Sequence, residues 1–305
     1  WYTQPFVVRP DLPIKNSAGD YNKIDEIGMM GRNGLYSPNP VAMLNMKNSH
    51  ESSQLLANAY AEFSIYKGLK FRADYGHTNY KYESSYFRPI ITQQDQSILG
   101  ESPISTLTLW NGIYKTSTAN FQVDYKLDTG KHNINALLGY GTERTRNVLT
   151  TLTYEGFPND EVLNNVASAK WSSGQNQILQ KHGLNSWFTR LNYGYFNKYF
   201  AEFSFRADAS SKFGPNNQWG YFPAFSAAWV ASQENFFKHF RWLDNLKFRA
   251  SIGQTGSTNI DDFSYRQYYS SKGQYIGNSS IVLNDMLPNK GIKWEKTTES
   301  NFGID

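Results

Sequence analysis

Hydrophobic and polar residues alternate one by one along much of the chain, and short turns join the alternating segments in pairs. The first pair covers 55–66 and 69–75 and is joined by Lys67-Gly68. A second pair flanks residues 128–131, and a third flanks Asn197-Lys198. Alternation with period two indicates strands with one apolar and one polar face, so the sequence predicts antiparallel hairpins.

A fourth pair of alternating segments covers 219–231 and 246–256. The connection between them, Glu234 to Asn245, could hold a short helix. Most predicted strands exceed the ~5–6 residues that are usual in soluble sheets. They approach the ~9–11 residues that a tilted strand needs to cross a membrane.

The connections alternate between short and long. We expect long polar loops near 83–112, 154–182 and 257–293. Short turns at one end and long loops at the other are typical of outer-membrane barrels. A soluble β-sandwich or propeller would explain the alternation but not this asymmetry.

The two faces of the predicted strands also fit a barrel. One face carries Ala, Phe, Leu, Ile and Tyr, and the other carries Arg, Asp, Glu, Asn and Ser, as a wet lumen requires. Aromatic residues cluster at 195–200 and at 80–87, which suggests two interfacial girdles. We therefore predict an all-β fold, a segment of an antiparallel transmembrane β-barrel with about nine or ten strands.

Composition excludes some classes of protein. The chain has 305 residues, and no apolar run approaches the ~18–20 residues of a membrane helix. The absence of Cys excludes disulfides and thiolate metal sites. A net charge of +4 without a basic run gives no reason to expect nucleic acid as a partner. The 21 Tyr, 20 Phe and 8 Trp suit membrane interfaces but also sugar-binding surfaces, so they decide little.

Both ends of the sequence suggest that the chain is cut from a longer one. The chain begins at Trp1 without a starting Met or a signal peptide, and Asp305 stops inside an alternating pattern. We expect 1–305 to be part of one barrel domain, truncated at both ends.

No residue pattern predicts catalysis, a cofactor or a metal site, and we expect the protein not to be an enzyme. The His residues are scattered without metal-ligand spacing; they are His50, His77, His132, His182 and His239. We expect Asp261-Asp262 to be an exposed acidic pair in a loop. The glycines at 139–141 and 253–256 lack the strand–helix context of a phosphate-binding loop.

Two groups of side chains are candidates for ligand contact. Aromatic rings in the expected long loops could stack on sugars or contact a lid, or could simply pack within the loops or the girdle. These rings are Trp110, Tyr114, Tyr154, Trp171, Tyr268, Tyr269 and Tyr275. Three lumen-facing cations could guide an anionic substrate or pair with carboxylates of a plug, and these are Arg72, Arg206 and Arg249.

One region carries a series of short motifs in fixed order. They are RLNY at 190–193, KY at 198–199, FRADASSKFG at 205–214, WGYFPA at 219–224, AW at 228–229, ENF at 234–236, LKFRASIG at 246–253 and TG at 255–256. Flanking motifs are NPVA at 39–42 and WEKT at 294–297. In order and spacing, residues 39–305 resemble the SusC/RagA-type TonB-dependent outer-membrane transporters. We predict structural roles for these motifs. The chain would leave a strand at Ser210 to Gly214 and enter the next strand at Trp219 to Pro223.

The resemblance implies a plugged barrel of about 22 strands, of which this chain would supply about half. It also implies the bacterial outer membrane, energy from TonB, and a SusD-like surface lipoprotein that captures oligosaccharides or peptides. The family's plug and TonB-contacting segment lie upstream, and nothing in this sequence matches them. The alternative function is a surface barrel with a binding, adhesive or structural role and no transport.

Overall fold

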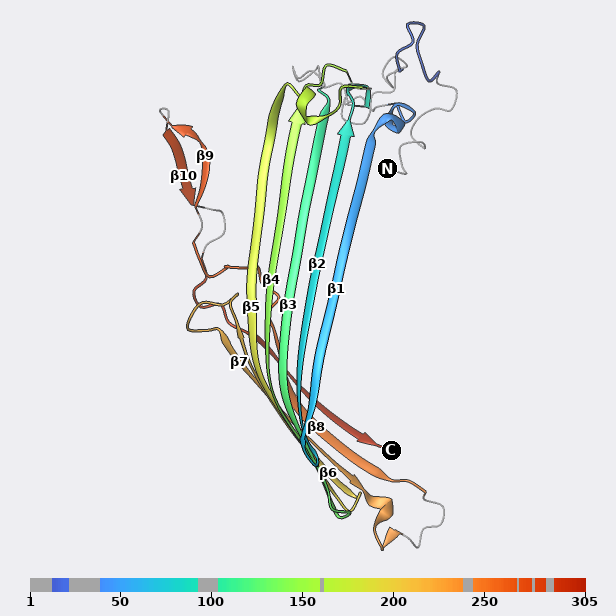
Figure 1. Ribbon diagram of the computed structural model, residues 1–305, viewed down its shortest axis with the longest axis vertical. Coiled ribbons are helices and arrows are strands. Elements are labelled where there is room, and N and C mark those ends of the chain that lie inside the picture. Colours follow the sequence, from blue (N-terminus) through green and yellow to red (C-terminus); the bar gives the residue numbers. More distant parts are fainter. Residues whose placement is uncertain are drawn as a thin grey trace. The chain divides into compact units, whose positions relative to one another are not determined.

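The computed structural model describes residues 13–21, 39–92, 104–159, 162–237, 244–267, 269–275, 278–283 and 288–305. These residues form mainly β-strands (Figure 1). In this part of the chain, no helix combines the length and the apolar character needed to cross a membrane.

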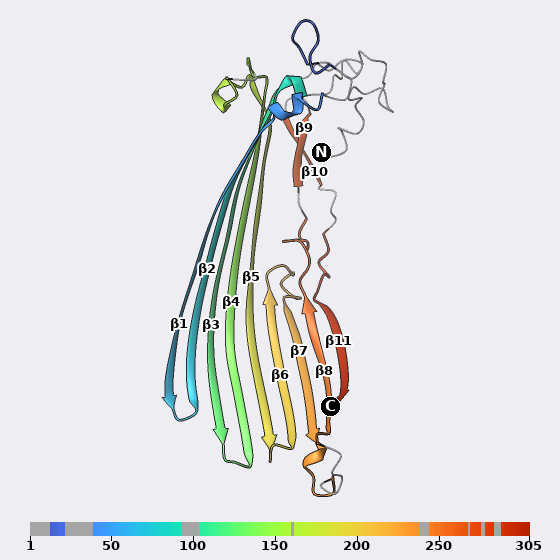
Figure 2. The same cartoon turned by 90° about the vertical axis from the view of Figure 1, so that its right-hand side faces the viewer.

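Nine strands of the described residues form one antiparallel sheet, in the order β1-β2-β3-β4-β5-β6-β7-β8-β11 (Figure 2). Their bounds are β1 Lys47–Tyr66, β2 Leu69–Arg88, β3 Thr106–Asp128, β4 His132–Glu155, β5 Trp171–Tyr195, β6 Tyr199–Ser210, β7 Trp219–Val230, β8 Lys247–Ser257 and β11 Glu295–Ile304. The predicted all-β sheet of a barrel segment is confirmed.

Shorter elements lie outside this sheet. Strands β9 (Tyr269–Tyr275) and β10 (Asn278–Leu283) pair only with each other. Among the described residues, the four short 3-10 helices are η3 Ala42–Asn45, η4 Ile90–Thr92, η6 Val166–Ser168 and η7 Ala231–Gln233. The helix expected between Glu234 and Asn245 falls mostly outside the described residues.

The three predicted short turns are confirmed, and each contains at least one residue with positive φ, a backbone conformation that is common in turns. Gly68 has a φ of 80° between β1 and β2, and Gly130 has a φ of 81° between β3 and β4. The Gly130 amide also donates to Asp128 Oδ1 at 2.8 Å. Phe196 and Asn197 adopt left-handed φ values of 52° and 57° between β5 and β6. These geometries keep the connections short and so fix the pairing of the strands they join.

Gly68→Ala is expected to destabilise the protein more than Gly130→Ala. Both residues have left-handed φ, which costs an Ala residue about 1 kcal/mol. A Cβ at Gly68 would also meet the backbone carbonyl of Lys126, whereas a Cβ at Gly130 has nothing within 4 Å. We expect a cost of about 2–3 kcal/mol at Gly68 and about 1 kcal/mol at Gly130. Equal unfolding free energies of the two variants in detergent would contradict this.

Strands β1 to β5 are longer than the sequence suggested. They contain 20 to 25 residues each. Parts of two expected loops are strand instead, because β2 and β3 include 83–88 and 106–112, and β4 and β5 extend into 154–182. Residues 83–85 and 172–177 are polar or Gly at every position, so these strand ends lack the apolar–polar alternation by which strands are recognised.

The chain divides into two compact units, each with its own buried cluster. Unit 1 contains Trp1–Gln54, Tyr80–Tyr114 and Asn147–Leu179, and unit 2 contains Leu55–Asn79, Lys115–Arg146 and Gln180–Asp305. In unit 1, Phe87, Leu107 and Phe157 are buried together, and the rings of Phe87 and Phe157 meet edge to face at 5.2 Å. In unit 2, the buried cluster is formed by Phe213, Phe222 and Trp294.

Candidate functional site

One face of the sheet in unit 2 is apolar across five neighbouring strands. The strand register aligns side chains into transverse rows that line one shallow apolar hollow. The rows are Leu191-Phe203-Phe225-Ile252-Ser300 and Tyr193-Ala201-Ala227-Ala250-Phe302. Many of these side chains are exposed although they are large and apolar; Phe225 is 55% exposed and Ile252 51%. Such a broad exposed apolar surface indicates contact with lipid or a partner.

The opposite face is polar, as predicted. A row between the two apolar rows runs Asn192-Glu202-Ser226-Ser251-Asn301. The next row begins with Arg190 opposite Ser204. Because successive side chains of a strand point to opposite faces, the sheet separates the apolar rows from the polar ones.

The three candidate cations each pair with a carboxylate of this chain. Arg72 donates to Asp74 Oδ1 from Nε at 2.9 Å and from Nη2 at 2.7 Å. Arg206 Nε donates to Asp208 Oδ2 at 2.7 Å. In both pairs the partner is two residues along the same strand and therefore on the same face.

Arg249 pairs differently, across two strands. Its Nη2 donates to Asp305 Oδ1 at 3.1 Å, and its side chain is 61% exposed. All three guanidinium groups are thus already oriented by acids, and whether they also guide a substrate stays a prediction.

Aromatic rings mark both ends of the apolar rows. At the short-turn end, the ring of His132 lies between Tyr193 and Tyr195, at 6.0 and 5.0 Å. At the other end, Tyr140 contacts Trp187 at 4.9 Å, and Trp187 is 51% exposed. Trp219 and Tyr221 of β7 are likewise exposed, and their rings stack at 6.4 Å.

One aromatic residue expected in the second girdle is buried instead of exposed. Phe87, one of the aromatic residues expected there, is buried in unit 1. The ring of Tyr82 covers Gly112 on the neighbouring strand β3. Both positions follow the local strand pairing, which the sequence pattern did not resolve.

Four of the candidate loop aromatics lie in strands of the nine-stranded sheet, so their assignment to loops was wrong. Trp110 and Tyr114 belong to β3, Tyr154 to β4 and Trp171 to β5. The reason is the extra length of these strands, whose polar ends resemble loops in sequence.

The surroundings of these four rings differ. Tyr154 packs against the buried cluster of unit 1. Trp171 is 40% exposed and its Nε1 donates to Glu155 Oε2 at 3.1 Å. Trp110 and Tyr114 share one face of β3 with Gly112, because alternate residues of a strand point the same way. Tyr82 adds a third ring to that face through its contact with Gly112.

The remaining three candidates lie near or within β9 in sequence. Tyr268 lies outside the described residues. Tyr269 and Tyr275 are the ends of β9, and their side chains fall outside the description. Ligand contact by any of the seven rings remains a prediction.

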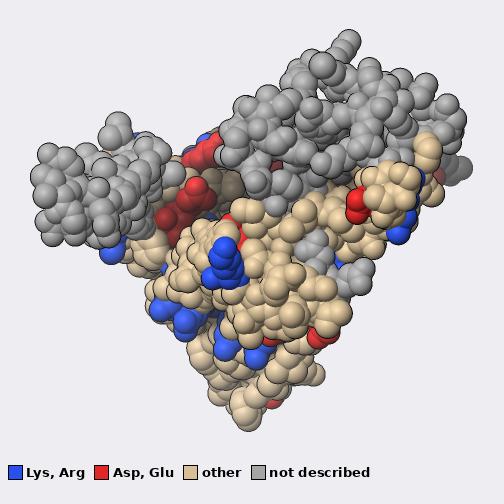
Figure 3. Space-filling model, turned by 90° about the horizontal axis from the view of Figure 1, so that it is seen from above, with Lys and Arg blue, Asp and Glu red and all other residues tan. Residues whose placement is uncertain are grey.

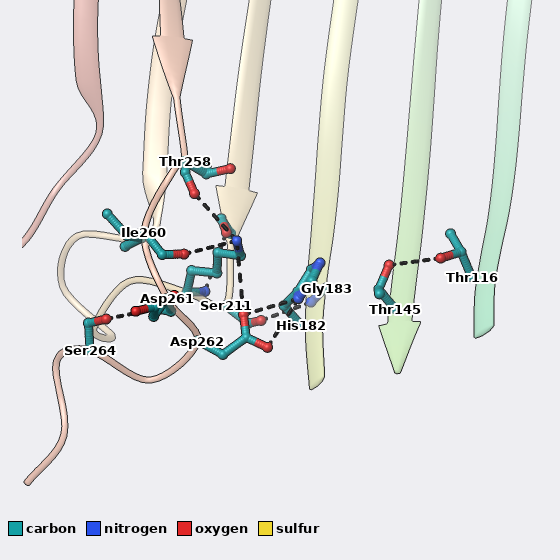
Figure 4. Close-up of polar contacts among 12 residues, drawn as sticks. Thr116, Thr145, His182, Gly183, Ser211, Thr258, Ile260, Asp261, Asp262 and Ser264 are labelled. Atoms are coloured by element: carbon teal, nitrogen blue, oxygen red, sulfur yellow. Dashed lines mark hydrogen bonds and ion pairs between the residues drawn. The ribbon is translucent and has the colours of Figure 1, made fainter. Parts of the chain in front are cut away.

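A polar anchor fastens the segment after β8 to His182 in the middle of β5 and to the segment just after β6 (Figure 4). His182 Nδ1 lies 3.0 Å from Asp262 Oδ1, and the Asp262 side chain is only 7% exposed. Lys212 Nζ donates to the carbonyls of Ile260 and Thr258 at 3.0 and 3.4 Å, and lies 4.0 Å from Asp262. The expectation of an exposed acidic pair was thus wrong for Asp262. Its partner His182 is 80 residues away in sequence, so no local pattern could have revealed the contact.

Aromatic packing supports this anchor. Phe213 is fully buried, and its ring lies 5.2 Å from that of Trp294. Trp294 also contacts Phe222 at 5.3 Å and donates from Nε1 to the Gln218 carbonyl at 2.8 Å. These residues belong to the motifs FRADASSKFG, WGYFPA and WEKT, whose predicted structural role is consistent with this cluster.

A second polar cluster forms at the short-turn end around Glu234, in the motif ENF. Tyr199 Oη donates to Glu234 Oε1 at 2.7 Å, Lys198 Nζ to Oε2 at 3.2 Å, and Trp229 Nε1 to Oε1 at 3.4 Å. The hydrogen bond from Tyr199 chiefly, with those from Lys198 and Trp229, lowers the pKa of Glu234.

This lowered pKa predicts a pH dependence of stability. Because Glu234 binds its proton less tightly in the folded state, its carboxylate adds stability above its unfolded pKa, about 4.3. That stability is lost as the pH falls from there through the folded pKa. Glu234→Gln should therefore flatten part of the acid limb of a stability-against-pH curve measured by chemical unfolding between pH 7 and pH 3. An unchanged curve would show that the cluster is not linked to folding.

The described residues contain no group of three or more His, Cys, Asp or Glu side chains that could hold a metal ion. Charged side chains are nevertheless unevenly placed. Seen from above, several Lys and Arg side chains gather on one part of the described surface (Figure 3).

The known proteins that resemble this chain in sequence are TonB-dependent receptors. No family model matches the chain. TonB-dependent receptor P3 of Formosa agariphila is 28% identical over 300 residues, which cover 97% of this chain and 29% of the receptor. TonB-dependent receptor SusC of Bacteroides thetaiotaomicron is 38% identical over 137 residues, 43% of this chain and 14% of SusC. The chain thus spans less than a third of the length of the curated relatives it matches.

Solved structures support the same fold. The RagAB peptide importer in its closed-closed state matches with a TM-score of 0.80 and 22% identity, over 94% of this chain and 31% of that chain. The open-open state of the same importer matches with a TM-score of 0.77. Together with the two-faced sheet, these likenesses show that the chain corresponds to a segment of the β-barrel of SusC/RagA-type TonB-dependent receptors.

Proposed function

We propose that the chain forms part of the barrel wall of a TonB-dependent importer in the bacterial outer membrane. The observation that carries this proposal is the two-faced sheet of unit 2, in which apolar rows on one face alternate with charged and amide rows on the other. Lipid would cover the apolar face, and the polar face would line a water-filled lumen. On this proposal, residues 1–305 belong to one barrel domain.

Strand length supports the same placement. A tilted strand crosses the hydrocarbon with about 9–11 residues. Strand β5 contains 25 residues and β4 contains 24. At about 3.3 Å per residue, each is more than twice as long as a crossing requires. The extra strand residues would extend beyond the hydrocarbon at the end of the barrel that carries the long connections. In outer-membrane barrels this end faces the cell exterior.

The proposed cargo is an oligosaccharide or a peptide, captured with a SusD-like surface lipoprotein. The relative SusC and the structurally similar RagAB, a peptide importer, support this class of importer. The rings of Trp110 and Tyr114, with Tyr82, offer a face on which sugar rings or apolar side chains could stack. The proposed role involves binding and passage and no catalysis.

Uptake measurements test the proposal. Cells that make the protein from its own gene should import labelled oligosaccharides or peptides, and import should stop when TonB is deleted. Uptake that is independent of TonB would contradict an energised importer and favour the surface barrel without transport. An affinity tag on the protein should co-purify a surface lipoprotein encoded nearby, and recovery of the barrel alone would contradict the partnership.

A double substitution tests whether the aromatic face formed by Trp110 and Tyr114 acts in uptake rather than in folding. Trp110→Ala together with Tyr114→Ala should reduce uptake while leaving the barrel in the outer membrane. The matched control is Tyr66→Ala, because Tyr66 is 76% exposed beside the β1–β2 turn. Equal uptake by both variants would show that the face does not contact cargo or lid.

A further inference from the structure

A cavity of about 580 Å³ in unit 2 is lined by an excess of cations. Its lining includes Lys115 of β3, Arg144 and Arg146 of β4, Lys181 of β5, and His77 of β2. Hydroxyl and amide groups complete much of the wall. These are Ser117, Asn185, Ser210, Ser211 and Gln218. Such a combination of cations and hydrogen-bond donors suits a phosphate group.

The cations of β4 and β5 lie on the apolar side of the sheet rather than on the side of the lumen. A Cβ at Gly183 would meet the guanidinium of Arg144, so the two residues share a face. Arg144 Nη1 donates to Asn185 Oδ1 at 3.2 Å, and Tyr140 contacts Trp187 on the same face. On β5 this face continues by alternation to Leu191 of the apolar rows.

Alternation extends this face to the other cations. Lys181 is two residues from Gly183, and Arg146 is two residues from Arg144, so both point to the apolar side. On the neighbouring strands, His77 Nδ1 lies 2.9 Å from Ser117 Oγ, and Lys115 is two residues from Ser117. The cavity therefore opens on the surface that would face lipid.

Few carboxylates of the described residues pair with the cations of the cavity. In the part of the chain that the structure describes, Lys115, Arg146 and Lys181 form no ion pair with a carboxylate. By contrast, Arg72 and Arg206 on the polar face each pair with an Asp. An anion supplied from outside the chain would neutralise the three unpaired cations.

The height of the cavity fits the headgroup layer. Arg144 is four residues from Tyr140, and Lys181 is six residues from Trp187, in the direction away from the short turns. At about 3.3 Å per residue and a tilt of about 45°, these steps rise about 9 and 14 Å above the aromatic rings. Tyr and Trp rings sit at the boundary between hydrocarbon and headgroups. The cations therefore lie where phosphates of the outer leaflet would be.

We propose that this cavity binds the phosphate of a phosphorylated glycolipid in the outer leaflet, with Lys115, Arg144, Arg146 and Lys181 as its cationic contacts. The inference rests on the proposed outer-membrane location. It adds a specific lipid site to the wall of the barrel, separate from the polar face that would contact cargo. The lipid acyl chains would lie along the apolar rows below.

The test measures binding of phosphorylated lipid A to the whole protein, purified in detergent from cells that make it from its own gene. The triple variant K115Q/R146Q/K181Q removes three cations from the cavity. The control K67Q/K126Q/K131Q removes the same charge beside the short turns. Each cation near an anionic surface contributes about fivefold in affinity, so the cavity variant should bind roughly a hundredfold more weakly, and the control should bind like the wild type.

Three further measurements identify the source of the anion. Lipid A from which phosphate has been removed should bind the wild-type protein as weakly as phosphorylated lipid A binds the cavity variant. Millimolar inorganic phosphate should not displace phosphorylated lipid A. Equal affinity of the cavity variant and the wild type, equal affinity for dephosphorylated lipid A, or displacement by inorganic phosphate would each overturn the lipid site.

Cell fractionation separates this inference from the proposed function. A protein that is absent from the outer membrane would overturn both. A protein that reaches the outer membrane, folds there and transports in a TonB-dependent way, but binds lipid A equally in all variants, would overturn the lipid site alone.

Discussion

Ala201→Arg is expected to destabilise the barrel by about 2–4 kcal/mol. Ala201 lies in the second apolar row, between Tyr193 of β5 and Ala227 of β7. It is exposed, and the hollow it lines is apolar. An Arg there would carry a charge into the middle of the hydrocarbon layer, with no carboxylate in the row to pair with. Unfolding from lipid vesicles by denaturant measures the loss.

The matched control for this change is Ser226→Arg. Ser226 lies on the polar face opposite Glu202 of β6, so an Arg side chain would meet water and an acid. We expect a change within about 0.5 kcal/mol. Ala59→Arg and Asn58→Arg repeat the comparison on β1, where the pattern places Ala59 on the apolar face. Equal losses at Ala201 and Ser226 would contradict the assignment of the two faces.

Phe213→Ala is expected to cost about 3–5 kcal/mol, because it would empty a fully buried site. The ring of Phe213 packs against Trp294, and the preceding residue Lys212 holds the carbonyls of Thr258 and Ile260. Loss of the ring should therefore also release the segment after β8. Besides a lower unfolding free energy, we expect faster proteolysis within 258–267.

The control for Phe213 is Phe236→Ala, since Phe236 is 59% exposed outside the sheet. It should change stability by less than about 1 kcal/mol. Unfolding that is equally affected in both variants, or proteolysis of 258–267 that does not change in the Phe213 variant, would contradict the role of the anchor.

Much of the sheet could be predicted from the sequence because its strands have unlike faces. Around Lys67-Gly68 and Asn197-Lys198, single-residue alternation and turn residues gave both the strands and their pairing. The same signal fails where both faces of a strand are polar. Residues 83–85 and 172–177 are strand in the structure, yet they are polar or Gly at every position and so resemble a loop in sequence.

The contacts of the candidate site could be predicted less well, because they join distant parts of the sequence. Asp262 meets His182 across 80 residues, and nothing near either residue indicates the other. The four cations of the cavity lie on three strands, and Lys115 and Lys181 carry no motif. Their proximity depends on the register between long strands, which the sequence does not show. For Trp110 and Tyr114, only the residue type could be predicted, and the strand position could not.

Site-directed spin labelling of β6 tests the central claim, that one face of this sheet meets lipid and the other meets water. Residues 1–305 contain no Cys, so a single Cys placed at each of positions 199 to 206 gives the only label within this segment. In lipid vesicles, labels at 201, 203 and 205 should collide most with lipid-soluble oxygen, and labels at 202, 204 and 206 most with a water-soluble nickel complex. The two accessibilities should thus alternate in opposite phase with a period of two. Accessibilities that lack this period, or that show it with the phases exchanged, would contradict the account.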